Sequence, residues 1–128
     1  MDSTTLVGAG CLACIDGDRD YDELVWNKHP TFAGVSLKHL LTSADTGGAL
    51  SAHLVRIQAG CCLETHTHPN SLELHEVVSG SGKAELAGRS ASYAPGVCGL
   101  IPAGVAHSVR ANAEQDLYIL AKFAPALL

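Results

Sequence analysis

The sequence is short of basic residues, long apolar runs and a basic N-terminus. Eight Lys and Arg stand against thirteen Asp and Glu, so the formal net charge at pH 7 is -5. Nucleic acid and anionic membranes both attract a basic face, so neither is an expected partner. No apolar run reaches the roughly 18 residues of a membrane span, and Met1-Asp2-Ser3 lacks the basic start of a signal peptide. We therefore expect a cytoplasmic protein.

Large side chains are scarce as well. The 128 residues include one Met, one Trp, two Phe and three Tyr, but thirteen Gly. A chain of this length can bury a real core as one domain and is too short for two. Abundant glycine with few large side chains is typical of many tight turns around small aliphatic residues. The composition therefore favours a single all-β domain.

The sequence also lacks a convincing set of paired cysteines. Its five cysteines are an odd number, and the neighbours Cys61 and Cys62 form a type of pair that rarely closes a disulfide. Free thiols in a reducing compartment fit better. Cys11 and Cys14 have the C-x-x-C spacing of a zinc or redox half-site, but no second C-x-x-C or H-x-x-x-H follows. We interpret them as two small buried thiols on an N-terminal strand.

Short runs separated by turn residues fill the chain after residue 30. Turns are predicted where Gly and Pro gather, as at 46–48, 94–96 and 102–104. The regular spacing of these turns is typical of a β-sandwich or barrel. The predicted strands are 34–41, 49–58, 62–66, 72–79, 82–87, 97–101, 106–111 and 116–123.

One stretch, GCCLETHTHPNSLELHEVVSG at 60–80, concentrates residues that bind metal. His66 and His68 are two residues apart, so on an extended strand both side chains leave the same face and can converge on one ion. Residues 69–71 are typical of a turn, and an alternating run starts near Glu73. We expect a hairpin that folds Glu73 back over the two histidines.

A second stretch, GVCGLIPAGVAHSVRAN at 96–112, places another histidine after a tight turn. Pro102, Ala103 and Gly104 form the turn between two short strands, and His107 follows early in the second strand. A further ligand nitrogen could reach the first stretch from this distant part of the chain.

The two stretches resemble the two motifs of the cupin superfamily, G(x)5HxH(x)3-4E(x)6G and G(x)5PxG(x)2H(x)3N. The first motif matches at Gly60, His66, His68, Glu73 and Gly80 with every spacing satisfied. The second matches at Gly96, Pro102, Gly104 and His107, but Ala111 stands at the last position and the asparagine follows at Asn112. Only fifteen residues separate the motifs, so the chain resembles a small single-domain RmlC-like cupin.

The resemblance implies an all-β fold, a double-stranded β-helix or jelly-roll barrel. We expect the cupin domain at 31–128 and a short irregular or strand-forming arm at 1–30. One divalent transition metal per chain is implied in the mouth of the barrel, with the ligands His66, His68, Glu73 and His107. Three neutral imidazoles and a carboxylate suit iron, manganese, nickel, copper or zinc, and they can leave a coordination position open for a substrate.

Other polar residues are candidates for a substrate pocket. His75 shares the strand parity of Glu73, so it should face the barrel interior as a catalytic acid or base or as a substrate contact. His53 and Arg56 leave opposite faces of the run 49–58, and either face could line the pocket. Tyr118 carries the same ambiguity on the last strand. We therefore consider His53, Arg56 and Tyr118 as candidates for substrate binding.

Two functions remain open. A metal-dependent enzyme acting on a small organic molecule is favoured, and the resemblance implies dioxygenase, isomerase, decarboxylase or lyase chemistry. The alternative is a non-catalytic module that binds or senses a small ligand or a metal. The resemblance also implies a homodimer. We expect the apolar segment 6–15 to add a strand to one sheet or to a partner's sheet, where it would cover an exposed edge.

Overall fold

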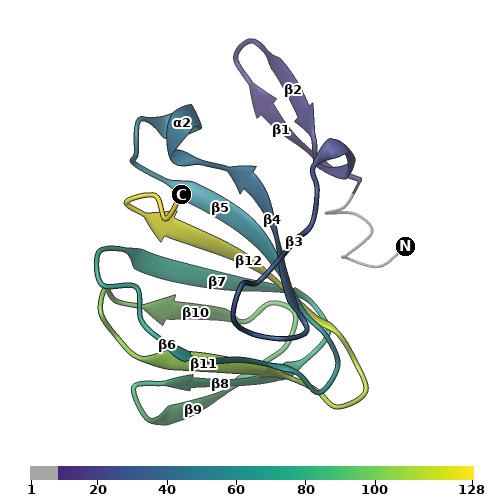
Figure 1. Ribbon diagram of the computed structural model, residues 1–128, viewed down its shortest axis with the longest axis vertical. Helices are drawn as coiled ribbons and strands as arrows, with labels where there is room; N and C mark the ends of the chain where they lie inside the picture. The colour runs from purple at the N-terminus through teal and green to yellow at the C-terminus, as the bar shows by residue number, and fades with distance from the viewer. Residues whose placement is uncertain (1–8) are drawn as a thin grey trace.

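Two antiparallel sheets face each other in the computed structural model, which describes residues 9–128 (Figure 1). Six strands form one sheet in the order β10-β7-β12-β5-β4-β3, and four form the other in the order β6-β11-β8-β9. The strands are β1 (Cys11–Cys14), β2 (Gly17–Asp20), β3 (Asn27–Lys28), β4 (Val35–Leu41), β5 (Ser51–Ile57), β6 (Cys62–His66), β7 (Leu72–Ser79), β8 (Gly82–Leu86), β9 (Arg89–Tyr93), β10 (Cys98–Ile101), β11 (His107–Ala111) and β12 (Leu117–Ala124).

The apolar core fills the space between the two sheets. On β12, Leu117, Ile119, Ala121 and Phe123 are buried, and the residues between them are partly exposed. Successive residues of a strand face opposite sides of a sheet, so this alternation gives the strand one apolar face. Val109 of the facing sheet belongs to the same buried cluster. The arrangement confirms the predicted all-β jelly-roll fold.

The eight strands predicted after residue 30 are all present, but the prediction omits β9 from that part of the chain. This strand has the sequence RSASY, and its alternate residues Ser90 and Ser92 are exposed. Only Ala91 and Tyr93 are partly or fully buried, so the apolar pattern of this strand is short and weak. Its place in the sheet comes from pairing with β8, where Ala91 lies opposite Ala84. Such pairing depends on the whole fold and is not visible in a short run of sequence.

The connection between His68 and Glu73 shows that the predicted hairpin is wrong. Strand β6 pairs with β11 in the four-stranded sheet, whereas β7 pairs with β10 and β12 in the six-stranded sheet. Residues 67–71 therefore cross from one sheet to the other (Figure 1). Glu73 meets the histidines across the barrel interior, so the site forms only when the two sheets pack together.

An irregularity in β6 decides which of its side chains point inward. His66 lies opposite His107 and Leu63 lies opposite Val109, so three steps along β6 match two steps along β11. The extra residue is a β-bulge, and it resets the alternation of the strand. Leu63 and His66 both face the interior as a result. Cys62, next to Leu63, is turned away from the face that carries the histidines.

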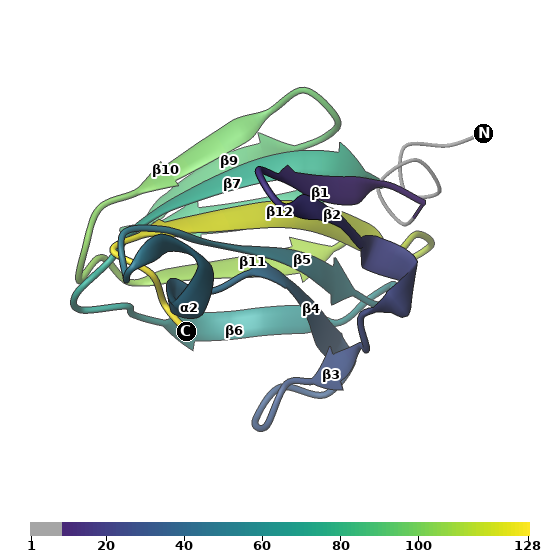
Figure 2. The same cartoon turned by 90° about the horizontal axis from the view of Figure 1, so that it is seen from above.

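The N-terminal hairpin stands apart from the barrel. Strands β1 and β2 pair only with each other, and they project on the side of the six-stranded sheet (Figures 1 and 2). The described part of segment 6–15 therefore adds no strand to the barrel sheets of its own chain, which rules out the first of the two expected placements. Addition to a partner's sheet stays a prediction, and residues 6–8 lie outside the described residues. An ion pair of 2.6 Å between Arg19 and Asp45 anchors the hairpin to the short helix α2 (Ser43–Thr46).

The chain then returns to the barrel within the predicted arm. The 3₁₀ turn η1 (Tyr21–Glu23) follows the hairpin, and the two residues of β3 pair with β4 at the edge of the six-stranded sheet. The arm thus contributes the last strand of that sheet. Within residues 9–128, no helix has the length and apolar character needed to cross a membrane.

Cys11 and Cys14 are exposed, which corrects the prediction that they are buried thiols. The projecting hairpin leaves them without a covering layer. Cys11 lies opposite Asp20 and Cys14 lies opposite Gly17. The two cysteines are three residues apart in sequence, so their side chains leave opposite faces of the hairpin and do not converge on one ion.

Gly80 supports a prediction about stability. Its φ is +81°, and a Cβ there would collide with the backbone carbonyl of Asp116. Gly88 has a similar φ of +85°, but a Cβ there would meet nothing within 4 Å. Gly88→Ala should lower the unfolding free energy by about 1 kcal/mol through backbone strain alone. Gly80→Ala should lower it by about 3 kcal/mol, because the backbone must also move.

Urea unfolding of the two variants measures this difference at one pH. Gly88→Ala is the matched control, since it imposes the same positive φ without the collision. Equal losses in the two variants would show that the approach of Gly80 to Asp116 has no energetic consequence.

Candidate metal centre

His66 and His107 each present one ring nitrogen to the barrel interior. The Nδ1 of His66 is 2.7 Å from the carbonyl oxygen of Glu64. The Nδ1 of His107 is 2.9 Å from the carbonyl oxygen of Val105. A carbonyl only accepts hydrogen bonds, so in the neutral rings each Nδ1 donates its proton and each Nε2 keeps a lone pair. A histidine that binds a metal through Nε2 needs this tautomer.

His68 and Glu73 converge on the same point. A nitrogen of His68 lies within 4.8 Å of ligand nitrogens from His66 and His107. Glu73 arrives from the other sheet, with Oε1 3.0 Å from Nε2 of His107 and 3.7 Å from Nε2 of His68. The four residues predicted as ligands are thus linked through His68 and His107, since the three histidines group together and Glu73 approaches two of them. We call these four residues the metal group.

Two atoms of the metal group lack a hydrogen-bond partner. Glu73 Oε1 and His107 Nε2 are buried, and although they are 3.0 Å apart their geometry is not that of a hydrogen bond. With the proton of His107 on Nδ1, two lone pairs face each other, which is unfavourable unless a cation lies between them. Two ligands about 2.1 Å from one ion and at right angles would be about 3.0 Å apart. The donor atoms and their spacing therefore fit a transition metal ion.

The charge of Glu73 also favours a cation. Burial raises the pKa of Glu73, but the rings of His107 and His75 outweigh burial and hold the pKa well below its usual range. Burial lowers the pKa of His107, yet the Glu73 carboxylate and the Val105 carbonyl raise it more, so its net pKa is raised. The carboxylate that attracts a proton to Nε2 of His107 also attracts a metal ion, so the two compete for this nitrogen.

His75 lies directly behind Glu73. Its Nε2 is 2.7 Å from Oε2 of Glu73, and its Nδ1 is 2.9 Å from the hydroxyl of Tyr93. A carboxylate only accepts, so Nε2–H of His75 donates to Glu73 and the Tyr93 hydroxyl donates to Nδ1. His75 could also join Glu73 and His107 as a three-ligand group. Both of its nitrogens are already engaged, however, and its contacts orient Glu73 while leaving Oε1 free for an ion.

Tyr93 and Gly99 are parts of this site that the sequence did not reveal. Burial and the nearby Glu73 raise the pKa of Tyr93 to about 12, so its hydroxyl remains a donor. Gly99 lies opposite His75 on β10, and a Cβ there would collide with the Tyr93 hydroxyl. The absence of a side chain at Gly99 therefore allows Tyr93 to reach His75. No short motif signals a contact that joins three strands.

A small cavity of about 90 Å³ adjoins the metal group. Its walls include three members of that group, His66, His68 and Glu73, and otherwise His29, Val35, Leu37, Val55, Leu63, Ala121, Phe123 and Leu127. Ligand sites for drug-sized molecules measure roughly 300 to 1,000 Å³. The cavity is therefore suited to a molecule of only a few non-hydrogen atoms with an apolar part.

The three candidates for substrate binding lie elsewhere. His53 faces the interior but is fully buried, with Nδ1 2.8 Å from Nδ1 of His39 and Nε2 2.9 Å from the Ser51 hydroxyl. Arg56 and Tyr118 lie on the outer face of the six-stranded sheet, since their neighbours in sequence fill the core. Arg56 makes an ion pair of 2.9 Å with Asp116. None of the three lines the cavity beside the metal group.

The buried His53 predicts how stability depends on pH. Burial, followed by the neighbouring His39, lowers the pKa of His53 from 6.5 to about 4. The unfolded chain therefore binds a proton that the folded chain rejects, and the unfolding free energy should fall as the pH drops from 6.5 to 4. The loss from this group is about 3 kcal/mol and is absent above pH 6.5. In urea unfolding with a chelator present, His53→Asn should show a smaller fall than the wild type between pH 7.5 and 4.5. An identical fall would contradict the prediction.

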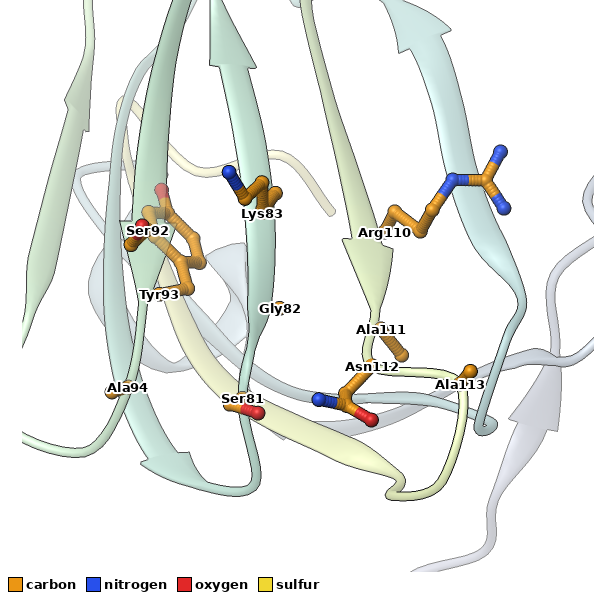
Figure 3. Close-up of a pocket in the computed structure, with 10 residues that line it drawn as sticks. All are labelled: Ser81, Gly82, Lys83, Ser92, Tyr93, Ala94, Arg110, Ala111, Asn112 and Ala113. Atoms are coloured by element: carbon orange, nitrogen blue, oxygen red, sulfur yellow. The ribbon is translucent and has the colours of Figure 1, made fainter.

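A larger groove, of about 600 Å³, lies away from the metal group, where β8 begins and β9 and β11 end (Figure 3). Lys83 and Arg110 are on adjacent strands there, but their side chains extend in different directions. The Arg110 guanidinium donates instead to the carbonyl of Gly60, 3.3 Å away. The described residues of this groove offer no converging acids, bases or metal ligands, so its greater volume does not make it the reactive site.

The fold and the site together define a β-barrel protein that gathers three histidines and a glutamate in its interior. The chain belongs to the cupin family, because the cupin domain model matches residues 53–123, more than half of the sequence. No curated protein sequence matches the chain.

Several solved structures share the fold. KdgF from a Halomonas species is 25% identical, with a TM-score of 0.70 over 81% of this chain and 90% of that chain. A Thermotoga maritima protein described as a predicted oxalate decarboxylase is 22% identical, with a TM-score of 0.73 over 82% of this chain and 96% of that chain. The polyketide cyclase RemF from Streptomyces resistomycificus is 16% identical, with a TM-score of 0.71 over 84% and 82% of the two chains. The last two likenesses show the fold alone.

Proposed function

We propose that this cupin is a metalloenzyme in which one divalent transition metal ion, held by the metal group, binds and activates a small organic molecule. The observation that carries the proposal is the pair of buried, unpartnered atoms, Glu73 Oε1 and His107 Nε2, beside a small apolar cavity. Iron, manganese, nickel, copper and zinc all accept this donor set. Because the donors come from two packed sheets and the connection between them, the folded barrel holds them in place before an ion arrives.

The residues of the chain have distinct tasks in this proposal. His66, His68 and His107 supply neutral nitrogens, and Glu73 supplies the negative charge that offsets part of the charge of the ion. His75 and Tyr93 hold Glu73 in one orientation. Once bound, the metal supplies Lewis-acid or oxygen-activating chemistry. The apolar walls limit the contact of the site with water, which strengthens each charge interaction there.

The reaction class is open among dioxygenase, isomerase, decarboxylase and lyase chemistry. Oxalate decarboxylases and a polyketide cyclase occur among the similar folds, but at identities of 16% to 23%. The cavity volume of about 90 Å³ favours a small acid of the size of oxalate over a substrate of the size of a polyketide. We therefore place short organic acids first among the substrates to test.

Turnover by the metal-loaded protein tests the proposal. The chain would be loaded separately with iron, manganese, nickel and zinc and incubated with short carboxylic acids, diketones and thiols. Oxygen uptake and product formation by NMR would be recorded. Glu73→Gln is the matched control, since it keeps the size of the side chain and removes its charge. Conversion that depends on both metal and Glu73 supports an enzyme. A fully loaded protein that binds these molecules and converts none favours the alternative, a binding or sensing module.

A further inference from the structure

His29 lines the cavity beside the metal group but belongs to neither cupin motif. It follows β3 in the N-terminal arm, where its backbone N–H donates to the carbonyl of Val35 at 2.8 Å. This bond ties the residue to the start of β4, whose Val35 and Leu37 form part of the cavity wall. A segment outside the two motifs thus delivers a polar side chain to the site.

The hydrogen bonds of His29 determine where its ring carries a proton. Its Nδ1 accepts the backbone N–H groups of Thr31 and Phe32, both at 3.1 Å. A nitrogen that accepts these bonds has no proton of its own, so the neutral ring is protonated on Nε2. Burial lowers the pKa of His29, which also favours the neutral ring. The stable form of His29 therefore carries one N–H donor, at the far end of the ring.

The ring of His29 is also held in one orientation. The Phe32 ring stacks on it with centroids 4.6 Å apart and an interplanar angle of 18°. No described residue is a hydrogen-bond partner for Nε2, whereas both Nδ1 bonds are made. The half-buried ring therefore has an oriented N–H donor that a ligand in the cavity can engage.

The chemistry of the cavity limits what that ligand can be. Outside the metal group, His29 is the only described wall residue with a polar side chain. A divalent ion with one carboxylate and three neutral imidazoles carries a net positive charge, which attracts an anion. The remaining walls are Val, Leu, Ala and Phe, and the volume is about 90 Å³. A short carboxylate with a small apolar tail meets all three conditions.

Building on the proposed function, we propose that His29 is a ligand-binding residue: its Nε2–H donates a hydrogen bond to the carboxylate of a short-chain acid in the metal pocket. The acid has about two to four carbons, given the volume of the cavity. The apolar tail of the acid packs against the aliphatic wall. The N-terminal arm is then part of the binding site, although it lies outside the matched domain at 53–123.

The test uses the full chain loaded with zinc, which has no redox chemistry, and propionate as the probe. Calorimetry measures propionate affinity, and elemental analysis measures the zinc content of the same samples. His29→Asn keeps an oxygen that can accept the Thr31 and Phe32 N–H groups but removes the distal donor. His29→Gln restores a donor near the position of Nε2. We expect His29→Asn to weaken propionate binding about tenfold, a loss of about 1.4 kcal/mol, and His29→Gln to remain within about threefold of the wild type. All three proteins should hold equal zinc.

The other outcomes separate this inference from the proposed function. Wild-type propionate affinity in a fully loaded His29→Asn protein would overturn the role of His29 and leave the metal site intact. Failure of the loaded wild type to bind propionate or acetate would overturn the carboxylate class. A wild-type chain that takes up no zinc, iron, manganese or nickel would contradict the metal site itself. Hexanoate should bind at least tenfold more weakly than propionate, and equal affinity would overturn the size limit.

Discussion

Replacing His107 with alanine is expected to abolish stable metal binding. His107 is shared by both three-residue groups in the described chain that could hold an ion. Its Nδ1 is fixed by the Val105 carbonyl, and its Nε2 faces Glu73 at 3.0 Å. Changes to residues that merely support a ligand cost 10- to 100-fold in metal affinity, so loss of this ligand should cost more than about 100-fold. Competition with a fluorescent chelator measures the affinity.

His53→Ala is the matched control for this experiment. His53 is as deeply buried as His107 but lies outside the metal group. The His53→Ala protein should be less stable than the wild type but should still bind about one ion per chain. Circular dichroism with urea unfolding would establish that both variants fold. A folded His107→Ala protein with wild-type metal affinity would mean that the ligand set is wrong.

Replacing His75 with alanine should also weaken metal binding, by about 10- to 100-fold. Both ring nitrogens of His75 are engaged, because Nε2–H donates to Oε2 of Glu73 and Nδ1 accepts from Tyr93. Without it, Glu73 loses its orienting bond and gains a void in which to turn. Tyr93→Phe removes only the hydroxyl and should weaken binding by less, about threefold to tenfold. Chelator competition with each protein gives the two affinities.

This comparison also separates two roles for His75. As a residue that positions Glu73, it changes metal affinity when replaced. As the catalytic acid or base that its sequence position suggests, it would reduce turnover of the loaded protein while the metal affinity stayed the same. An unchanged metal affinity in a folded His75→Ala protein would therefore contradict the positioning role, and reduced turnover of the same protein would support the catalytic one.

Local pattern was sufficient to predict most of the strands, and the resemblance to the cupin motifs supplied the four members of the metal group. Alternation of apolar residues identifies β12 and β7, because each strand has one face against the core. The same parity places Glu73 and His75 on the inner face of β7, where both are buried. The H-x-H spacing and the turn before His107 were informative because the residues of each motif are close together in sequence.

Long-range features could not be predicted in this way. Whether β7 pairs with β6 or with β10 and β12 depends on contacts distant in sequence, so the expected hairpin was wrong. The bulge in β6 breaks the alternation that would have grouped Cys62 with His66. His29 reaches the cavity only because β3 adds to the sheet edge, within an arm that resembles no known motif. The boundary at residue 30, the homodimer and the cytoplasmic location stay predictions.

The most direct test of the metal group is a crystal structure of the metal-loaded chain with anomalous diffraction at the absorption edge of the metal. We predict one anomalous peak per chain, about 2.0 to 2.3 Å from ligand atoms of His66, His68, His107 and Glu73. Oε2 of Glu73 should remain bonded to His75. A peak coordinated by His75, a peak outside the barrel interior or no peak from a loaded protein would contradict the account.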